Sequence, residues 1–168
     1  MSLARLCLLS LLAATLGVSI WVFWLHAAHL EVDGGLRSFD SRFGGYTLAD
    51  ARDYLTRLDP EPYALYQGLA RWLDLLFPAL LGLSMGVFYW RVTTYLNQWS
   101  RLVLLLFPSG YVLMDLCENA LIQEMLAHTA AHLDPETVSL ASHFTITKFV
   151  LLAVSLLAGL LLRVLRPR

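Results

Sequence analysis

The sequence predicts an all-α protein, a four-helix transmembrane bundle with an extracytoplasmic amphipathic helix in its first loop. Hydrophobic residues make up 58% of the 168-residue chain and charged residues only 15%, whereas a water-soluble domain usually carries about 25% charged residues. Four apolar runs account for this composition, at residues 6–25, 72–90, 102–126 and 144–162. At about 1.5 Å of rise per residue, each run can cross a hydrocarbon core of about 30 Å as a helix. Helices are required because lipid offers the backbone no hydrogen-bond partner.

The first run could instead be a signal peptide, because Arg5 precedes it. Signal-peptide cores are shorter, at about 7–15 residues, and this run ends in the bulky residues Trp21, Phe23 and Trp24. We therefore expect an uncleaved membrane anchor, so that residues 1–168 form a single transmembrane domain.

The long first loop, residues 27–71, contains the predicted amphipathic helix at about residues 47–58. Thr47 is followed three residues later by Asp50, which is a weaker form of the capping box that begins many helices. The apolar residues of this stretch share one helical face, namely Leu48, Ala51, Tyr54, Leu55 and Leu58. Positive and negative residues balance on the opposite face, so we expect a lid over the bundle rather than a helix that binds anionic lipid.

The distribution of arginine predicts the orientation. Arginine without any acidic residue occurs at Arg5, in the connection 91–101 and in the tail 163–168, whereas the connection 127–142 carries two acidic residues and no lysine or arginine. Because positive residues stay on the cytoplasmic side, both termini are predicted to be cytoplasmic and the first loop extracytoplasmic. We expect a multi-pass protein of the plasma membrane, specifically of a bacterial inner membrane.

Charge and histidine patterns argue against two further functional classes. The net charge is −1 and the basic residues are scattered, so no nucleic-acid partner is expected. His128 and His132 have the i, i+4 spacing that can chelate a metal, but no cysteine or His–Glu signature accompanies them. The sequence therefore predicts neither a metal site nor a cofactor.

The ionisable residues singled out inside the apolar runs are Asp74, Asp115, Glu118 and Lys148. A charged side chain costs about 2.5–3.5 kcal/mol near the centre of a membrane helix, so such residues usually face the bundle interior and pair. Helical spacing places the polar residues of the third and fourth runs on one face each. These residues are Tyr111, Asp115, Glu118 and Asn119 in the third run, and Thr145 and Lys148 in the fourth.

A short connection makes the third and fourth helices antiparallel neighbours, so Glu118 and Lys148 are predicted to pair. One lysine cannot neutralise both acids, and we expect Asp115 to be the group that gains and loses a proton.

Two features of the second run bear on helix packing. Pro78 has no N–H and therefore leaves the backbone carbonyl of Asp74 without its helical donor. Gly82 and Gly86 form a GxxxG pattern, which permits close approach of a neighbouring helix.

The segment Asp115-Leu-Cys-Glu118-Asn119, followed by Thr145-Ile-Thr-Lys148, resembles a pattern in small four-helix bacterial inner-membrane proteins. Gly45-Tyr46-Thr47 and Asp74-Leu-Leu-Phe-Pro78 are similar as well, so the likeness spans about residues 40–150. The resemblance implies the same topology and groups the polar residues into one constellation, made up of Asp74, Asp115, Glu118, Asn119 and Lys148. It implies no particular reaction.

The expected function is a small ligand-binding or proton-coupled module with a buried polar site in the outer half of the bilayer. The candidate residues are Asp74, Tyr111, Asp115, Glu118, Asn119, Thr145 and Lys148, and a lipidic ligand suits such a pocket.

Two alternatives to this function remain. One is an accessory or assembly subunit of a larger membrane complex, in which the polar face sets helix register. The other is an intramembrane enzyme acting on a lipidic substrate. Membrane lipids are the expected partners, a membrane-protein partner or a homodimer is left open, and no catalytic residue is assigned.

Overall fold

The computed structural model describes residues 3–32 and 35–165, so Arg166 and Arg168 of the predicted cytoplasmic tail lie outside it. Within these ranges every regular element is a helix, apart from one isolated β-bridge in the first loop. The all-α prediction is confirmed.

Four helical segments are long and apolar enough to span a membrane, namely Arg5–Leu30, Pro60–Val92, Gln98–Leu126 and Pro135–Val164. The prediction of four such helices is confirmed, as expected for a multi-pass membrane protein. Only between 6% and 33% of the most apolar window of each segment is buried inside the protein. The remaining apolar surface is suited to contact with lipid.

The first span consists of α1 (Leu3–Leu25) and a π-helical turn, η1 (His26–Leu30). The second consists of α3 (Pro60–Leu65), the π-helical turn η3 (Tyr66–Ala70) and α4 (Arg71–Val92). The third joins α5 (Gln98–Leu104) to α6 (Leu106–Leu126), and the fourth is α7 (Pro135–Val164). Three short elements lie between the spans, namely η2 (Phe39–Ser41), α2 (Leu48–Arg57) and η4 (Ala130–His132).

Two spans begin well before the predicted apolar runs. The second begins at Pro60 rather than at residue 72, and the fourth at Pro135 rather than at residue 144. Both start with proline, whose missing N–H is not needed in a first helical turn. Hydropathy does not detect these first turns because they are polar. Asp74 consequently lies well inside its span rather than near the start.

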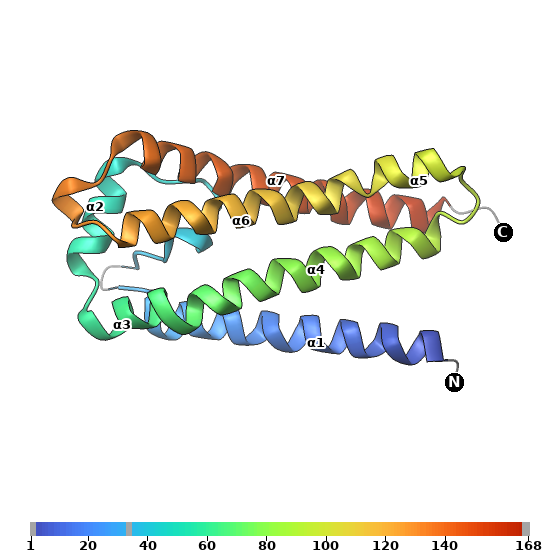
Figure 1. The fold of residues 1–168 in the computed structure, drawn as a ribbon, viewed down its shortest axis with the longest axis horizontal. Helices are drawn as coiled ribbons and strands as arrows, with labels where there is room; N and C mark the ends of the chain where they lie inside the picture. Colours follow the sequence, from blue (N-terminus) through green and yellow to red (C-terminus); the bar gives the residue numbers. More distant parts are fainter. Residues whose placement is uncertain (1–2, 33–34, 166–168) are drawn as a thin grey trace.

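The long helices lie side by side with roughly aligned axes (Figure 1). α6 and α7 make the most extensive contact, α4 packs against α6, and α1 packs mainly against α4. The beginning of α1 and the end of α7 lie at one end of the molecule, and α2 and α3 lie at the other (Figure 1). α1 is therefore an outer helix that is attached to the rest chiefly through α4.

The first loop folds back between the helices instead of remaining at their ends (Figure 1). Its short helix η2 contacts both α6 and α7. Phe39 is fully buried in η2 and makes ring contacts with Tyr46, Tyr54 and Tyr66, at centroid distances of 4.9, 4.9 and 6.4 Å. Burial of these aromatic rings holds the polar residues on either side of Phe39 inside the protein.

The predicted loop helix is present as α2, and its capping box is complete. Thr47 Oγ1 accepts a hydrogen bond from the Asp50 N–H (3.2 Å), and the Asp50 carboxylate accepts one from the Thr47 N–H (2.8 Å). Hydrogen bonds from Thr47 lower the pKa of Asp50. The apolar face of α2 packs against α7 and η4, with Ala51 and Tyr54 fully buried. α2 therefore covers one end of the long helices.

One glycine of the GxxxG pair accounts for the close packing of α4 on α6. A Cβ atom on Gly82 would overlap the side chain of Val112, whereas a Cβ on Gly86 would lie at an ordinary 3.7 Å from Leu105. The separation of the two helices therefore depends on Gly82.

Gly82→Ala is expected to destabilise the protein by about 1–3 kcal/mol, because α4 must move away from α6 or Val112 must shift. Gly86→Ala is the matched control, since the added methyl group has room and alanine favours a helix. Thermal unfolding in detergent, followed by circular dichroism, measures both variants. Equal melting temperatures would contradict close packing at Gly82.

Candidate functional site

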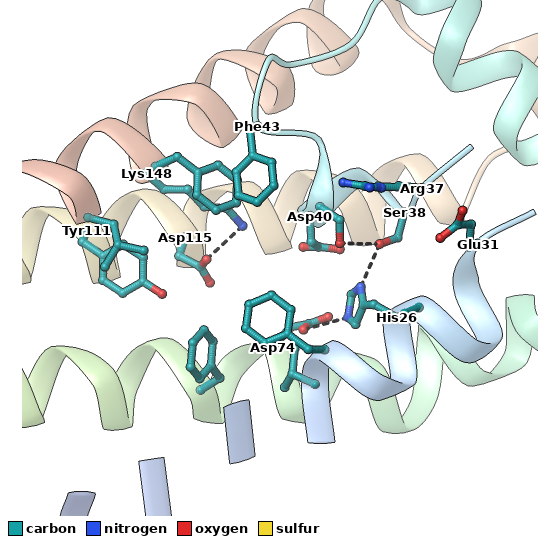
Figure 2. A pocket seen from close by; sticks show the side chains of 17 residues that line it. His26, Glu31, Arg37, Ser38, Asp40, Phe43, Asp74, Tyr111, Asp115 and Lys148 are labelled. Carbon is teal, nitrogen blue, oxygen red and sulfur yellow. Dashed lines mark hydrogen bonds and ion pairs between the residues drawn. The ribbon is translucent and has the colours of Figure 1, made fainter. Parts of the chain in front are cut away.

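A cavity of about 270 Å³ lies among α1, α4, α6, α7 and the first loop. Its walls are mainly aromatic and aliphatic and include Val22, Phe23, Phe43, Phe77, Phe149 and Leu152. Its polar groups come from η1, α4, α6, α7 and the first loop, as Figure 2 shows for His26, Asp40, Asp74, Tyr111, Asp115 and Lys148. The cavity thus combines apolar walls with convergent ionisable groups.

Lys148 forms the centre of one polar cluster. Its ammonium group lies 3.0 Å from Asp115 Oδ1 and also pairs with Oε2 of Glu118. Thr145 Oγ1 donates to the other carboxylate oxygen, Glu118 Oε1, at 2.6 Å. Glu118 and Thr145 are fully buried, and Asp115 and Lys148 are nearly so. The structure therefore places Lys148 against Glu118, as predicted, and against Asp115 as well.

Asn119 joins this cluster to α4. Its side-chain Nδ2 donates to the backbone oxygen of Asp74 (2.9 Å) and to Asp115 Oδ2 (3.0 Å). The Asp74 oxygen is the acceptor that Pro78 deprives of a helical donor. The acceptor predicted from the sequence is therefore satisfied by a side chain of a different helix, which ties α4 to α6.

Tyr111, also among the predicted site residues, lines the cavity beside Asp115 (Figure 2). Its side chain is only 2% exposed. Its hydroxyl has no hydrogen-bond partner within the described ranges, 3–32 and 35–165. The hydroxyl is therefore available to form a hydrogen bond with a molecule in the cavity.

His26 belongs to the site, although it is not among the residues predicted from the sequence. It lies in the π-helical turn η1, where Nε2 is 3.1 Å from Asp74 Oδ1 and Nδ1 is 2.7 Å from Ser38 Oγ. Ser38 Oγ in turn lies 3.2 Å from Ser41 Oγ, and Figure 2 shows His26 between Ser38 and Asp74. These bonds link α1 to α4 and to the first loop. The position of His26 at the end of an apolar run was the one signal for this role.

Asp40 is the second site residue that sequence reasoning missed. It lies in η2, and its Oδ2 accepts a hydrogen bond from the hydroxyl of Tyr66 (2.5 Å). Ligand atoms of Asp40, His26 and Asp74 all lie within 4.8 Å of one another. No local sequence signal identifies Asp40, because it occurs in a polar loop whose inward fold depends on Phe39.

The glycine–tyrosine pair of the first loop fits against α7. Gly45 has φ +77°, a conformation that favours glycine, and a Cβ there would lie 2.6 Å from Ser142 Oγ. The next residue, Tyr46, donates its backbone N–H to the same oxygen at 2.8 Å. Burial, and then the negative charge of Glu118, raise the pKa of the Tyr46 phenol. Tyr46 therefore remains neutral next to the Lys148 cluster.

Acidic groups outnumber basic groups in and beside the cavity. The acids are Asp40, Asp74, Asp115 and Glu118, and the basic groups in ion-pair contact with this set are Lys148 and His26. Glu31 and Arg37 also line the cavity and carry opposite charges. In a low-polarity interior, an excess of negative charge requires a proton, a cation or a polar ligand.

The two histidines with i, i+4 spacing, His128 and His132, do not line the cavity. His128 and His132 are exposed, and their Nδ1 atoms lie 2.9 Å from the Glu124 oxygen and 2.8 Å from Thr129 Oγ1. Neither residue belongs to a group of three potential metal ligands within the described part of the chain.

Lys148→Met is expected to lower the free energy of unfolding by about 3–5 kcal/mol, because it leaves two buried carboxyl groups without a cation. Combining it with Asp115→Asn and Glu118→Gln should recover most of this loss. The exposed Asp53–Arg57 pair (2.7 Å) is the control, and Asp53→Asn should cost less than about 1 kcal/mol. Chemical denaturation in detergent measures each variant. Additive losses in the triple variant would contradict the Lys148 pairing.

Comparison with known proteins adds no further evidence on the site. No protein-family model, curated protein or solved structure matches the chain. The function is therefore inferred from the geometry and chemistry of the cavity.

Proposed function

We propose that this protein is a membrane-embedded binding module that takes up the polar end of a lipidic ligand. The observation that carries the proposal is the cavity, in which apolar walls surround a few convergent polar groups, as in small-molecule sites. Its volume of about 270 Å³ lies just below the range of about 300–1,000 Å³ for whole-ligand pockets. A head group therefore fits inside while the hydrocarbon chain of the same ligand remains outside.

The ligand would enter from the bilayer between α1 and α7. Val22 of α1 and Leu152 of α7 both line the cavity, and α1 packs mainly against α4 rather than α7. Two aromatic residues of the lining, Phe23 and Phe43, are 64% and 58% exposed. In a membrane these surfaces would contact acyl chains, so an amphiphile could keep its chain in lipid while its polar end reaches Lys148.

The polar groups favour a ligand that donates hydrogen bonds, such as a hydroxyl- or amine-bearing amphiphile. Asp74 and Asp115 are acceptors when ionised, and they belong to a set of acids that exceeds the neighbouring bases. The Tyr111 hydroxyl can donate or accept. A ligand hydroxyl between Tyr111 and Asp115 would satisfy both groups, which stabilises the bound state.

The orientation in the membrane is part of the proposal. We infer a four-helix bundle in a bacterial inner membrane, with both termini in the cytoplasm and α2 on the outer side. Four arginines support this orientation, since all lie in elements at the end of the molecule where α1 begins and α7 ends (Figure 1). They are Arg5, Arg91, Arg101 and Arg163. The cavity would then lie in the outer half of the bilayer, beneath α2.

Leu152→Trp is expected to fill the cavity mouth and to reduce bound lipid at least about tenfold, which corresponds to about 1.4 kcal/mol. Leu157→Trp is the matched control, because Leu157 is on the same helix, is 58% exposed and does not line the cavity. Native mass spectrometry of protein released from membranes by mild detergent measures the bound lipid. Equal lipid retention in the wild type and both variants would contradict the proposed site.

The orientation is tested by fusing alkaline phosphatase to the chain in a bacterial host. A fusion after His132 should be active and a fusion after Arg163 inactive, because the enzyme needs disulfides that form outside the cytoplasm. Cellular phosphatase activity, normalised to fusion protein, measures both. Activity in the second fusion alone would show the reverse orientation.

A further inference from the structure

We propose that His26, Asp40 and Asp74 form a binding site for a divalent transition-metal ion, for which Zn²⁺ is well matched. The three residues come from different parts of the chain, η1, η2 and α4, and are all buried or half-buried. Their ligand atoms lie within 4.8 Å of one another beside the cavity (Figure 2). The fold has therefore assembled one imidazole and two carboxylates that are distant in sequence.

The donor set suits a first-row divalent ion. Neutral imidazole and carboxylate both bind Zn²⁺, at about 2.0–2.2 Å, so two ligand atoms on one ion are at most about 4.3 Å apart. His26 Nε2 and Asp74 Oδ1, at 3.1 Å, already meet this limit. A side-chain adjustment of less than about 1 Å would bring Asp40 within range.

Neighbouring side chains are placed to orient these ligands. Metal-bound histidine usually donates its second ring N–H to a nearby acceptor, and Ser38 Oγ lies 2.7 Å from His26 Nδ1. The Tyr66 hydroxyl donates to Oδ2 of Asp40, which leaves Oδ1 for an ion. Each of the three residues therefore keeps a ligand atom for an ion, and these atoms lie within 4.8 Å of one another.

The local charge supplies an argument that does not depend on ligand geometry. In the described part of the chain, neither Asp40 nor Asp74 forms an ion pair with lysine or arginine. Lys148 is engaged with Asp115 and Glu118. His26 is the basic group in direct contact with Asp74, and Arg37, which also lines the cavity, is matched by the acidic Glu31. One imidazole cannot balance two carboxylates, and uncompensated charge is costly in a low-polarity interior. A divalent cation would remove this deficit.

The cavity and Tyr111 provide an independent indication that something binds here. Three protein ligands leave at least one coordination position open on Zn²⁺, and the adjoining space is the cavity of about 270 Å³. Tyr111, a residue that is only 2% exposed and whose hydroxyl has no partner among the described residues, lines the same space. A water molecule or a ligand oxygen on the ion would therefore lie in a cavity that holds an unsatisfied polar group.

The full-length protein, purified in detergent and freed of metal with a chelator, provides the test. Titration with Zn²⁺ by isothermal calorimetry, with metal analysis after desalting, is expected to give one bound ion per chain. Asp40→Asn and His26→Gln should each weaken binding by more than about tenfold, since even outer residues such as Ser38 contribute about 10–100-fold at metal sites. Co²⁺ added in place of Zn²⁺ should show visible absorption that is lost in the same variants.

His132→Gln is the matched control, because it removes an exposed histidine outside the cavity. It should leave the stoichiometry and affinity unchanged. Circular dichroism of each metal-free sample identifies variants that fail to fold, and in that event the wild-type stoichiometry and the Co²⁺ spectrum decide. Absence of bound Zn²⁺ in the folded wild type would overturn the proposal, as would binding that survives Asp40→Asn but is lost in His132→Gln.

The metal proposal does not rest on the proposed lipid-binding function. Native mass spectrometry of the same samples, with and without Zn²⁺, separates the two. Lipid retained by a protein that binds no Zn²⁺ would refute only the metal site. Zn²⁺ bound by a protein that retains no lipid would refute only the lipid site.

Discussion

One buried ammonium group, that of Lys148, lies between two carboxylates of the neighbouring helix, and this interaction sets the relation of α6 to α7. Removing three charged groups from water is costly unless they meet at short range, so the helices pack in the register that brings Asp115 and Glu118 to Lys148. Thr145 occupies the remaining oxygen of Glu118. Asn119 then extends the network to α4 by bonding Asp115 and the Asp74 carbonyl.

The second half of the site attaches the outer helix and the first loop to this frame. Asp74 carries its backbone oxygen toward Asn119 and its carboxylate toward His26, so one residue of α4 connects both polar clusters. α1 is held against α4 in this way and does not close against α7. The cavity is lined by residues of both clusters and by Asp40 of the first loop. Both proposed functions use this space.

Much of this arrangement follows from local properties of the chain. Hydropathy identifies four spans because contact with lipid requires long apolar segments. Helical period places Asp115 and Glu118 on one face, opposite the lysine of the next helix. The acceptor created by Pro78 could also be predicted, since the absence of a proline N–H is a covalent fact. Span boundaries could not, because the first turns of α3 and α7 are polar and largely exposed, so hydropathy does not distinguish them from the loops.

The sequence by itself therefore determined the helical class, the four spans and the pairing of Lys148, because each depends on composition or on residues close along a helix. Only the tertiary structure decided that His26 and Asp40 face Asp74. Their approach requires the first loop to fold between the helices, where Phe39 packs on aromatic rings from other segments. No local pattern encodes that packing, because it is a property of surfaces brought together by the whole fold.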